Sequence, residues 1–288
     1  MRVPRGRRAT LARVTPRRTD FYEIPALYDI LHAPGTAREV DGLERIARRF
    51  LRAAPAHRAG HPAPLRWLEP ACGTGRYLRV LARRGHRAIG FDASRAMVDY
   101  ARRRLRDAGL SARARVILAP MTDFAGRLRP RSVHVAFNLI NTIRHLHSDR
   151  AMLDHFGAVA RVLKPGALYA VGISLSLYGI EQETEDVWQG TRGTCKVSQV
   201  VQYIPPDCTP RAPRGGNRLE RVISHLTITR PRGEEHRDST YALRTYDLAQ
   251  WQSLLRRSPF EVRVVLGDDG VEIAPPRIGY AIWVLTKE

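Results

Sequence analysis

The fold of this chain is decided by the stretch WLEPACGTGRYL at residues 67–78. A short apolar strand ends in an acidic residue, Glu69, and a turn with two glycines then leads into a helix. Gly73 and Gly75 have no Cβ, so the backbone there can turn tightly and let a ligand come close. The first N–H groups of the following helix have no partner inside the helix. We therefore expect a ligand-binding turn between a strand and a helix.

A second strand ends in a carboxylate seventeen residues after Gly75, in the run AIGFD at residues 88–92. Asp92 is then placed to accept hydrogen bonds from both hydroxyls of a ribose. The alternative role for this carboxylate is that of a helix N-cap. Together, the glycine turn and the carboxylate predict a cofactor that contains a nucleoside, bound on a strand–helix–strand unit.

Two classes of cofactor compete for this site. A dinucleotide site has the pattern Gly-x-Gly-x-x-Gly/Ala, but Leu78 stands where its third small residue belongs, which disfavours an oxidoreductase. The pattern present is acidic-x-small-x-Gly-x-Gly, formed by Glu69, Ala71, Gly73 and Gly75. This pattern resembles the first motif of class I S-adenosylmethionine-dependent methyltransferases of the small-molecule type.

The resemblance continues through four more motifs in the same order as in that family. It implies an α/β fold with a doubly wound, mostly parallel seven-stranded sheet, that is, a Rossmann-like methyltransferase fold whose last strand is antiparallel. The further motifs are the FDAS-x-x-M run at 91–97, the MTDF run at 121–124, the fourth strand at 133–138 and the LKPGAL turn at 163–168.

The resemblance also implies how the cofactor S-adenosyl-L-methionine, and its product S-adenosyl-L-homocysteine, would be held. In that family Glu69 would hold the amino group, Asp92 the ribose hydroxyls and Asp123 the adenine amine. The alternative for Asp123 is an ordinary turn aspartate. The residues implied to bind the cofactor are Glu69, Ala71, Gly73, Gly75, Asp92, Ala93, Met97, Met121, Thr122, Asp123, Phe124 and Asn138.

Candidates for the chemistry follow the fourth strand. Methyl transfer is an in-line displacement that needs the nucleophile about 3 Å from the methyl group and water excluded. A base is needed only where the acceptor arrives protonated, and His145 is the candidate base, with Asn141 to orient the acceptor. The alternative for His145 is a surface or capping histidine. Candidate acceptor-binding residues, each of which is alternatively an ordinary core or surface residue, are Tyr22, Tyr28, Tyr178, Arg244 and Tyr246.

The chain of 288 residues divides into a large α/β domain and an insertion. The insertion is expected to hold three strands, at 195–204, 219–229 and 236–246, and to form a flap over the open end of the sheet. We expect a basic, disordered arm at 1–19, a helical lid and cofactor-binding core at 20–176, an inserted antiparallel β flap at 177–246, and a closing helix and strand pair at 247–288.

The composition indicates in which compartment the protein works and which partners suit it. No apolar run reaches the ~18 residues of a membrane span, and three cysteines without metal-ligand spacing favour a cytoplasmic protein without a metal site. The net charge of +20 suits an anionic partner, but nearly all of the basic residues are arginines spread along the chain, which is also a bias of composition.

These observations predict an enzyme that transfers a methyl group from S-adenosyl-L-methionine to a nitrogen or oxygen of a small-molecule acceptor. A nucleic-acid methyltransferase is the first alternative, suggested by the charge. It is disfavoured because the fourth strand ends in the run NLIN at 138–141 and lacks the Asn/Asp-Pro-Pro-aromatic signature. A non-catalytic regulatory protein that binds the cofactor is the second alternative. The identity of the acceptor and the oligomeric state stay open.

Overall fold

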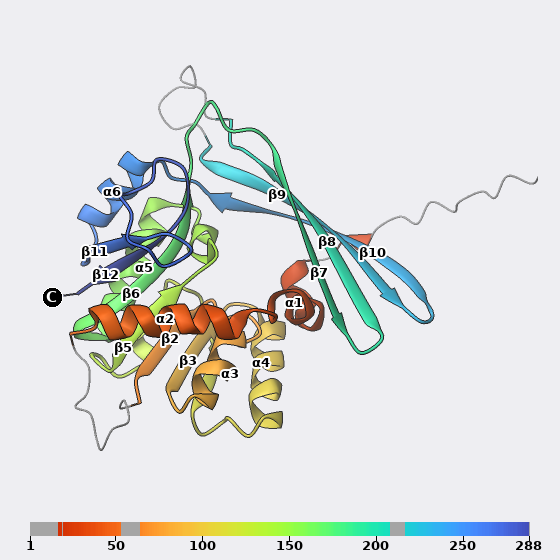
Figure 1. Cartoon of the computed structure of the whole chain (residues 1–288), viewed down its shortest axis with the longest axis horizontal. Coiled ribbons are helices and arrows are strands. Elements are labelled where there is room, and N and C mark those ends of the chain that lie inside the picture. Colours follow the sequence, from red (N-terminus) through yellow and green to blue (C-terminus); the bar gives the residue numbers. More distant parts are fainter. Residues whose placement is uncertain (1–16, 19, 53–63, 208–216, 288) are drawn as a thin grey trace, which may run out of the picture.

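The computed structural model describes residues 17, 18, 20–52, 64–207 and 217–287. It contains two sheets, which form a core lobe and a flap (Figure 1). The basic arm expected at 1–19 falls almost entirely outside the described residues. No helix in the described part of the chain is long and apolar enough to cross a bilayer.

The core sheet has seven strands in the order β11-β12-β6-β5-β2-β3-β4. Neighbouring strands from β6 to β4 pair in parallel, whereas β12 is antiparallel to both β6 and β11. The predicted doubly wound sheet with an antiparallel last strand is therefore confirmed. The strands are β2 (Arg66–Pro70), β3 (Arg87–Asp92), β4 (Ala114–Leu118), β5 (Val133–Asn138), β6 (Leu163–Leu175), β11 (Glu261–Leu266) and β12 (Gly279–Thr286).

Helices cover both faces of this sheet, which is why its central strands are buried on both sides. One face packs on an apolar cluster that includes Leu43 and Leu78, and the other face on a cluster that includes Phe156 and Trp251. The core helices are α2 (Thr36–Phe50), α3 (Arg76–Arg83), α4 (Arg95–Asp107), α5 (Asp149–Val162) and α6 (Leu248–Arg256), with short 3-10 turns η2 (Ala125–Arg127) and η3 (Thr142–His145).

The lid is the helical segment that precedes the core. It starts with a 3-10 turn, η1 (Phe21–Glu23), and continues as α1 (Pro25–His32). Pro25 occupies the first helical position of α1, where its missing N–H costs nothing and its fixed φ suits the helix. Pro25 thus marks the boundary between two short helical elements.

The flap is an antiparallel sheet of four long strands with a short edge strand, in the order β1-β10-β9-β8-β7. The prediction of three strands was wrong by one, because the side chains of the first strand are exposed on both faces and show no alternation. The last strand also ends two residues before the expected Tyr246. The strands are β7 (Thr184–Arg192), β8 (Cys195–Ile204), β9 (Leu219–Arg230), β10 (Gly233–Arg244) and β1 (Arg17–Arg18).

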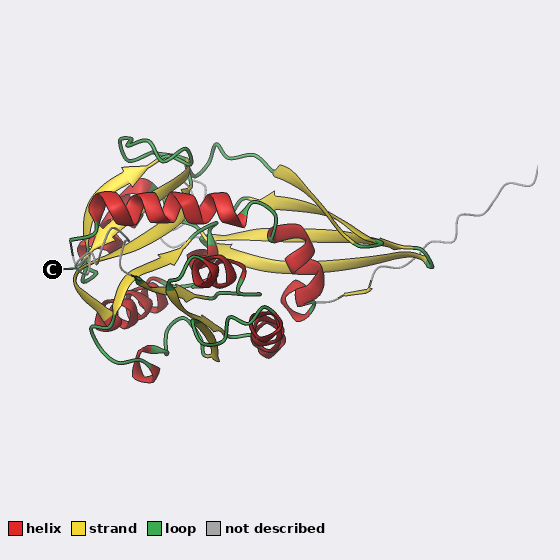
Figure 2. Cartoon of the chain, turned by 60° about the horizontal axis from the view of Figure 1, so that its bottom comes forward, coloured by secondary structure: helices red, strands yellow, loops and turns green. Residues whose placement is uncertain are grey.

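The lid helix α1 lies against the underside of the flap (Figure 2). Leu27 and Ile30 of α1 pack with Val197 and Leu226 of the flap in one small apolar cluster. A Cβ at Gly190 would collide with the backbone carbonyl of Ile30, so a glycine at that position lets β7 close on the helix. Lid and flap therefore form one cover over the open end of the core sheet.

Candidate functional site

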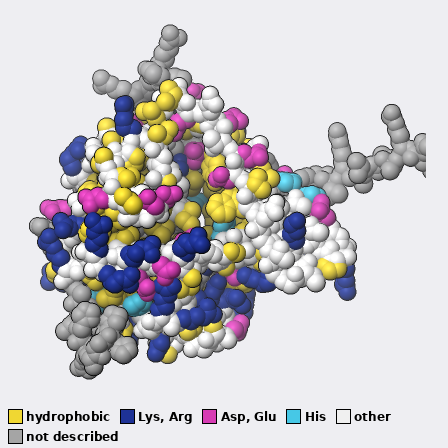
Figure 3. Space-filling model, in the orientation of Figure 1, with side chains coloured by type: hydrophobic (Ala, Val, Ile, Leu, Met, Phe, Trp, Pro, Cys, Tyr) yellow, Lys and Arg dark blue, Asp and Glu magenta, His cyan; other side chains and the backbone are white. Residues whose placement is uncertain are grey.

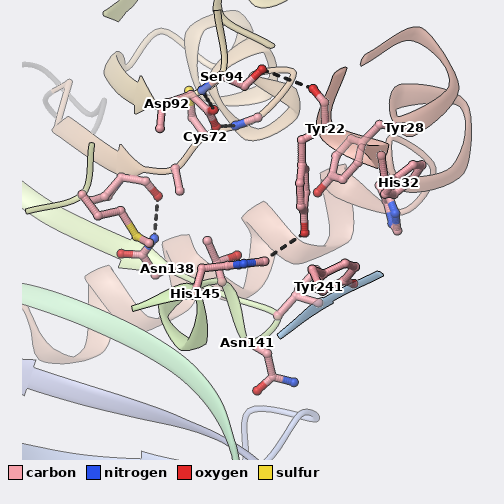
Figure 4. A pocket seen from close by; sticks show the side chains of 18 of the residues that line it. Tyr22, Tyr28, His32, Cys72, Asp92, Ser94, Asn138, Asn141, His145 and Tyr241 are labelled. Atoms are coloured by element: carbon pink, nitrogen blue, oxygen red, sulfur yellow. Dashed lines mark hydrogen bonds between the residues drawn. The ribbon is translucent and has the colours of Figure 1, made fainter. Parts of the chain in front are cut away.

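A cavity of about 640 Å³ lies between the core sheet and this cover. Its lining comes from the ends of β2, β3 and β5, from the lid, and from the inner face of the flap (Figure 4). Ligands of open α/β sheets bind beyond the carboxyl ends of the strands, and this is where the cavity lies.

The glycine turn forms one wall of the cavity. Gly73 and Gly75 both have φ in the left-handed region, at 50° and 68°, where glycine is favoured. A Cβ on Gly75 would lie 3.3 Å from the Cβ of Ala101, so this glycine also lets α3 pack closely on α4. Gly73 lines the cavity and Gly75 does not. The two glycines therefore have different roles, ligand access for the first and helix packing for the second.

Asp92 ties this turn to the end of β3. Its Oδ2 accepts a hydrogen bond from the backbone N–H of Gly73 at 2.7 Å, and its Oδ1 accepts one from Ser94 at 2.8 Å. Burial raises the pKa of the Asp92 carboxyl, against the lowering effect of these backbone donors. The carboxylate and its neighbour Ala93 line the cavity. The helix N-cap here is Ser94, which accepts from the N–H of Met97.

Glu69 carries a carboxylate oxygen that no described residue satisfies. The side chain is 6% exposed, and its Oε2 has no hydrogen-bond partner in the described part of the chain. Burial raises the pKa of this carboxyl well above its usual value, although nearby Arg76 lowers it. A buried carboxylate of this kind is stabilised by a cationic or N–H donor. The residues present therefore fit the ammonium group of the methionine moiety that the resemblance implies.

A buried chain of hydrogen bonds holds Asn138 in the cavity wall. Its Nδ2 donates to the carbonyl of Pro70 at 2.5 Å, and its Oδ1 lies 2.7 Å from the hydroxyl of Tyr169. The same hydroxyl lies 2.6 Å from Nε2 of His155, whose Nδ1 lies 2.9 Å from the carbonyl of Met121. Burial lowers the pKa of His155 to about 4, so this imidazole is neutral at pH 7. This series of hydrogen bonds connects Pro70 with Met121. Both residues line the cavity beside the ends of the core strands, as do Glu69 and Asp92, and this part of the cavity is called the cofactor half below.

Aromatic side chains from the lid and the flap form the opposite half of the cavity. The Tyr22 hydroxyl points at His145 and lies 3.0 Å from its Nε2 (Figure 4). Burial lowers the pKa of His145 to about 4, so the imidazole is neutral at pH 7, and in its Nδ1–H tautomer Nε2 accepts a hydrogen bond from the Tyr22 hydroxyl. Tyr28 and Tyr241 flank Tyr22 with ring centroids about 6 Å away. Two lid tyrosines and His145 therefore meet as expected, with a flap tyrosine that the sequence did not indicate.

Asn141 lines the cavity but has its side-chain amide engaged elsewhere. Its Nδ2 donates to Oγ of Ser174 at 3.0 Å, and its Oδ1 accepts from the N–H of Ser174 at 2.6 Å. Asn141 and Ile140 both have φ near 60°. These bonds pin a left-handed turn to β6, which is a structural role for the amide.

The structure leaves several predicted cofactor residues outside the cavity. Met97 is a buried residue of α4, and Phe124 is buried in the core, where it stacks on Phe91 at 4.8 Å. Asp123 is exposed and does not line the cavity, so its contact with adenine stays a prediction. The residues of the predicted cofactor set that do line the cavity are Glu69, Ala71, Gly73, Asp92, Ala93, Met121, Thr122 and Asn138.

Three predicted acceptor residues lie away from the cavity. Arg244 pairs with Asp149 at 3.1 Å, and its guanidinium lies 5.8 Å from the ring centroid of Tyr246. Tyr246 is fully buried and lies two residues beyond the end of β10, outside the strand that was expected to reach it. The Tyr178 hydroxyl bonds to Thr245 and to a glutamine of α6. This cluster joins the flap to the core, and none of the three residues lines the cavity.

Among the residues that line the cavity, sequence reasoning did not single out His32 of the lid or Gln199, Tyr203 and Tyr241 of the flap. The imidazole of His32 and the indole of Trp188 lie 5.5 Å apart between centroids, across the junction of lid and flap. The alternation of β8 does place Gln199 on the same face as the buried Val197. This polar residue on an otherwise apolar strand face is the sequence signal that could have identified Gln199 as a cavity residue.

Comparisons with known proteins agree with this geometry. Residues 68–166 match the model of a family described as a methyltransferase domain. The curated 24-methylenesterol C-methyltransferase 2 of Oryza sativa subsp. japonica is 32% identical over 138 residues, which are 47% of this chain and 34% of that protein. The chain thus spans about a third of the length of this relative.

Solved structures resemble the whole chain. DesVI of Streptomyces venezuelae superposes with a TM-score of 0.68 and 19% identity, over 94% of this chain and 100% of that one. The sugar N-methyltransferase KedS8 of Streptoalloteichus sp. gives 0.61 and 20%, over all of both chains. CalS10, an amino pentose methyltransferase of Micromonospora echinaspora with S-adenosylmethionine bound, gives 0.61 and 17%, over 95% of this chain and 99% of that one. At these identities the likeness establishes the fold.

Proposed function

We propose that this protein transfers a methyl group from S-adenosyl-L-methionine to a nitrogen or oxygen of a small-molecule acceptor. The match of residues 68–166 to the methyltransferase domain family supports the reaction class. The observation that carries the proposal is the unsatisfied, buried Oε2 of Glu69 in the same cavity as the Asp92 carboxylate. The Glu69 oxygen suits an ammonium group, and the Asp92 carboxylate suits a pair of ribose hydroxyls.

The chain offers a position for each part of the cofactor. Asp92 would hold the ribose, Glu69 the ammonium group, and Met121 and Thr122 one wall of the adenine pocket. Gly73 lines the same cavity and has no Cβ, so it would leave room for the methionine moiety. When bound, the cofactor supplies a methyl group on a positively charged sulfur, which is an excellent leaving group.

Tyr22 and His145 provide a route for the proton that the acceptor loses. In the displacement, a lone pair of the acceptor atom forms the bond to the methyl carbon. The carbon–sulfur bond breaks, and its electron pair stays on sulfur. The Tyr22 oxygen can accept the proton of the acceptor while its own proton passes to the neutral Nε2 of His145, 3.0 Å away. In this scheme Tyr22 contacts the acceptor and His145 is the base.

An amine is the first acceptor to test. KedS8 is named as a sugar N-methyltransferase and CalS10 as an amino pentose methyltransferase, and both share the fold over nearly the whole chain. The aromatic half of the cavity, with Tyr22, Tyr28 and Tyr241, would attract an amine through its ring faces. The cytoplasm is the proposed setting, on the ground of the few cysteines.

Calorimetric titration of the purified protein with S-adenosylmethionine, S-adenosylhomocysteine and NADH tests the cofactor assignment. We expect micromolar binding of the two sulfur compounds and no heat from NADH. Binding of NADH would favour an oxidoreductase, and failure of both sulfur compounds to bind would contradict the proposal.

A further inference from the structure

The inner face of the flap contains one polar side chain whose carbonyl has no partner. Gln199 is 2% exposed and lies between Val197 and Val201, which are both buried, on the same face of β8. Its Nε2 donates to Oγ of Ser224 on β9 at 2.8 Å. Its Oε1 has no hydrogen-bond partner among the described residues.

An unsatisfied buried carbonyl in a native protein calls for a physical explanation, because its desolvation is costly. Gln199 lines the cavity, so a bound ligand can supply the missing donor. The amide is also held in place, since its other end is fixed by Ser224, which is fully buried. The amide is thus held in a fixed orientation in the wall of the cavity.

The surroundings of Gln199 separate it from the cofactor contacts. Trp188 is its cross-strand neighbour on β7, and both residues line the cavity. Asp92 and Asn138 line the cavity from the ends of the core strands β3 and β5, whereas Gln199 lines it from the flap strand β8. A ligand group at Gln199 therefore lies under the flap, where the second substrate is expected.

We propose that Gln199 recognises the methyl acceptor, and that its Oε1 accepts a hydrogen bond from a hydroxyl or an amine N–H of that molecule. This inference rests on the proposed methyltransferase function. It assigns the acceptor to small polar molecules that carry a hydrogen-bond donor. A wholly apolar acceptor would leave the carbonyl of Gln199 unpaired and be rejected.

The first test uses stability, which requires no knowledge of the acceptor. In a double variant, Gln199→Leu with Ser224→Ala, both polar partners are replaced by apolar groups that fit the apolar strip around them. Because the unsatisfied carbonyl is removed, we expect the ligand-free double variant to melt at the same temperature as the wild type or above it. A clear decrease in melting temperature would show that the pair is structural and would overturn the proposal.

The second test uses binding, with glucosamine as the probe because it carries an amine and several hydroxyls on one ring. In calorimetry at saturating S-adenosylhomocysteine, we expect glucosamine to bind the wild type and to bind the double variant at least ten-fold more weakly. Gln202→Leu is the matched control, because Gln202 is exposed on the other face of the same strand. The control should bind as the wild type does.

Three outcomes of the binding test would overturn the assignment. The first is failure of glucosamine to bind the wild type, and the second is equal binding to the wild type and the double variant. Either result would mean that no donor is recognised at Gln199. A ten-fold loss of S-adenosylhomocysteine affinity in the double variant would place the contact on the cofactor. Failure of the proposed function is distinguishable, because it appears as loss of S-adenosylhomocysteine binding in the wild type itself.

Discussion

Asp92 combines two roles in one carboxylate, since it accepts two backbone N–H bonds and also lines the cavity. Asp92→Ala removes hydrogen bonds to a charged group, so we expect the affinity for S-adenosylhomocysteine to fall by about 2–3 kcal/mol in calorimetry. Asp107→Ala is the control, because Asp107 is exposed at the far end of α4. Unchanged affinity in the Asp92 variant would refute the ribose assignment.

His145 and Tyr22 make a second prediction at the level of single residues. Tyr22→Phe removes the hydroxyl between acceptor and base, and His145→Gln removes the base, so each should lower kcat by about 10²–10⁴-fold. The affinity for S-adenosylhomocysteine should stay within two-fold, since both side chains come from the acceptor half. Because the pKa of His145 is lowered to about 4, the fall in kcat that its protonation causes on the acid side of the pH profile should lie near pH 4. This fall should be absent in His145→Gln. An acid limb near pH 6.5 that is lost in the variant would contradict its burial.

At the scale of elements, Asp29 of α1 joins the lid to the core and to the flap. It is fully buried and accepts hydrogen bonds from Thr74 in the glycine turn, Arg79 of α3, Tyr100 of α4 and Arg192 of β7. Burial raises the pKa of this carboxyl, but Arg79 and the other donors outweigh burial and hold it below its usual value. One side chain of α1 therefore connects the glycine turn, α3, α4 and β7.

Asp29→Ala leaves the buried guanidinium of Arg79 without its partner. We expect the free energy of unfolding, measured in urea, to fall by about 3–5 kcal/mol. Asp154→Ala breaks an exposed pair with Arg150 at 3.0 Å, and it should cost under ~1 kcal/mol. Similar losses in the two variants would mean that the Asp29 cluster does not hold the cover in place.

The same elements explain what the sequence could predict. The core strands and helices each carry their own apolar period, so their existence and order follow from local pattern. The cofactor half of the site lies largely within one short run, from Glu69 to Asp92, and could be recognised there. In the acceptor half, Tyr22, His145 and Tyr241 meet only because lid and flap pack together, which no local pattern records. The flap strand β7 was not predicted from the sequence because its apolar residues Val187 and Trp188 are both exposed and give no alternating pattern.

At the scale of the whole molecule, arginines gather on the face of the core lobe formed by α2, α3 and α4 (Figure 3). This surface lies outside the cavity, so we expect any binding of duplex DNA to be electrostatic and independent of S-adenosylhomocysteine. Retention of a fluorescent duplex should fall by about 10³-fold or more between 50 and 200 mM salt. Salt-resistant binding together with methylation of the duplex would instead support the nucleic-acid alternative.

The stability of the whole chain should also depend on pH through His155, which is fully buried beneath Tyr169. Burial lowers the pKa of His155 to about 4, against 6.5 for an ordinary histidine. Between these pH values the unfolded chain binds a proton that the folded chain does not, so stability is lost as pH falls from 6.5 towards 4. The shift corresponds to about 3 kcal/mol.

His155→Gln keeps a hydrogen-bonding side chain at this position but cannot titrate. Urea unfolding at pH 7 and at pH 4 should therefore show a loss of stability in the wild type that exceeds the loss in the variant by about 3 kcal/mol. Other groups that titrate in this range contribute equally to both proteins and cancel in the comparison. Equal losses would mean that the histidine takes up its proton in the folded state, with both ring nitrogens donating. The buried chain from Asn138 to Met121 would then carry a positive charge next to the cofactor half of the cavity.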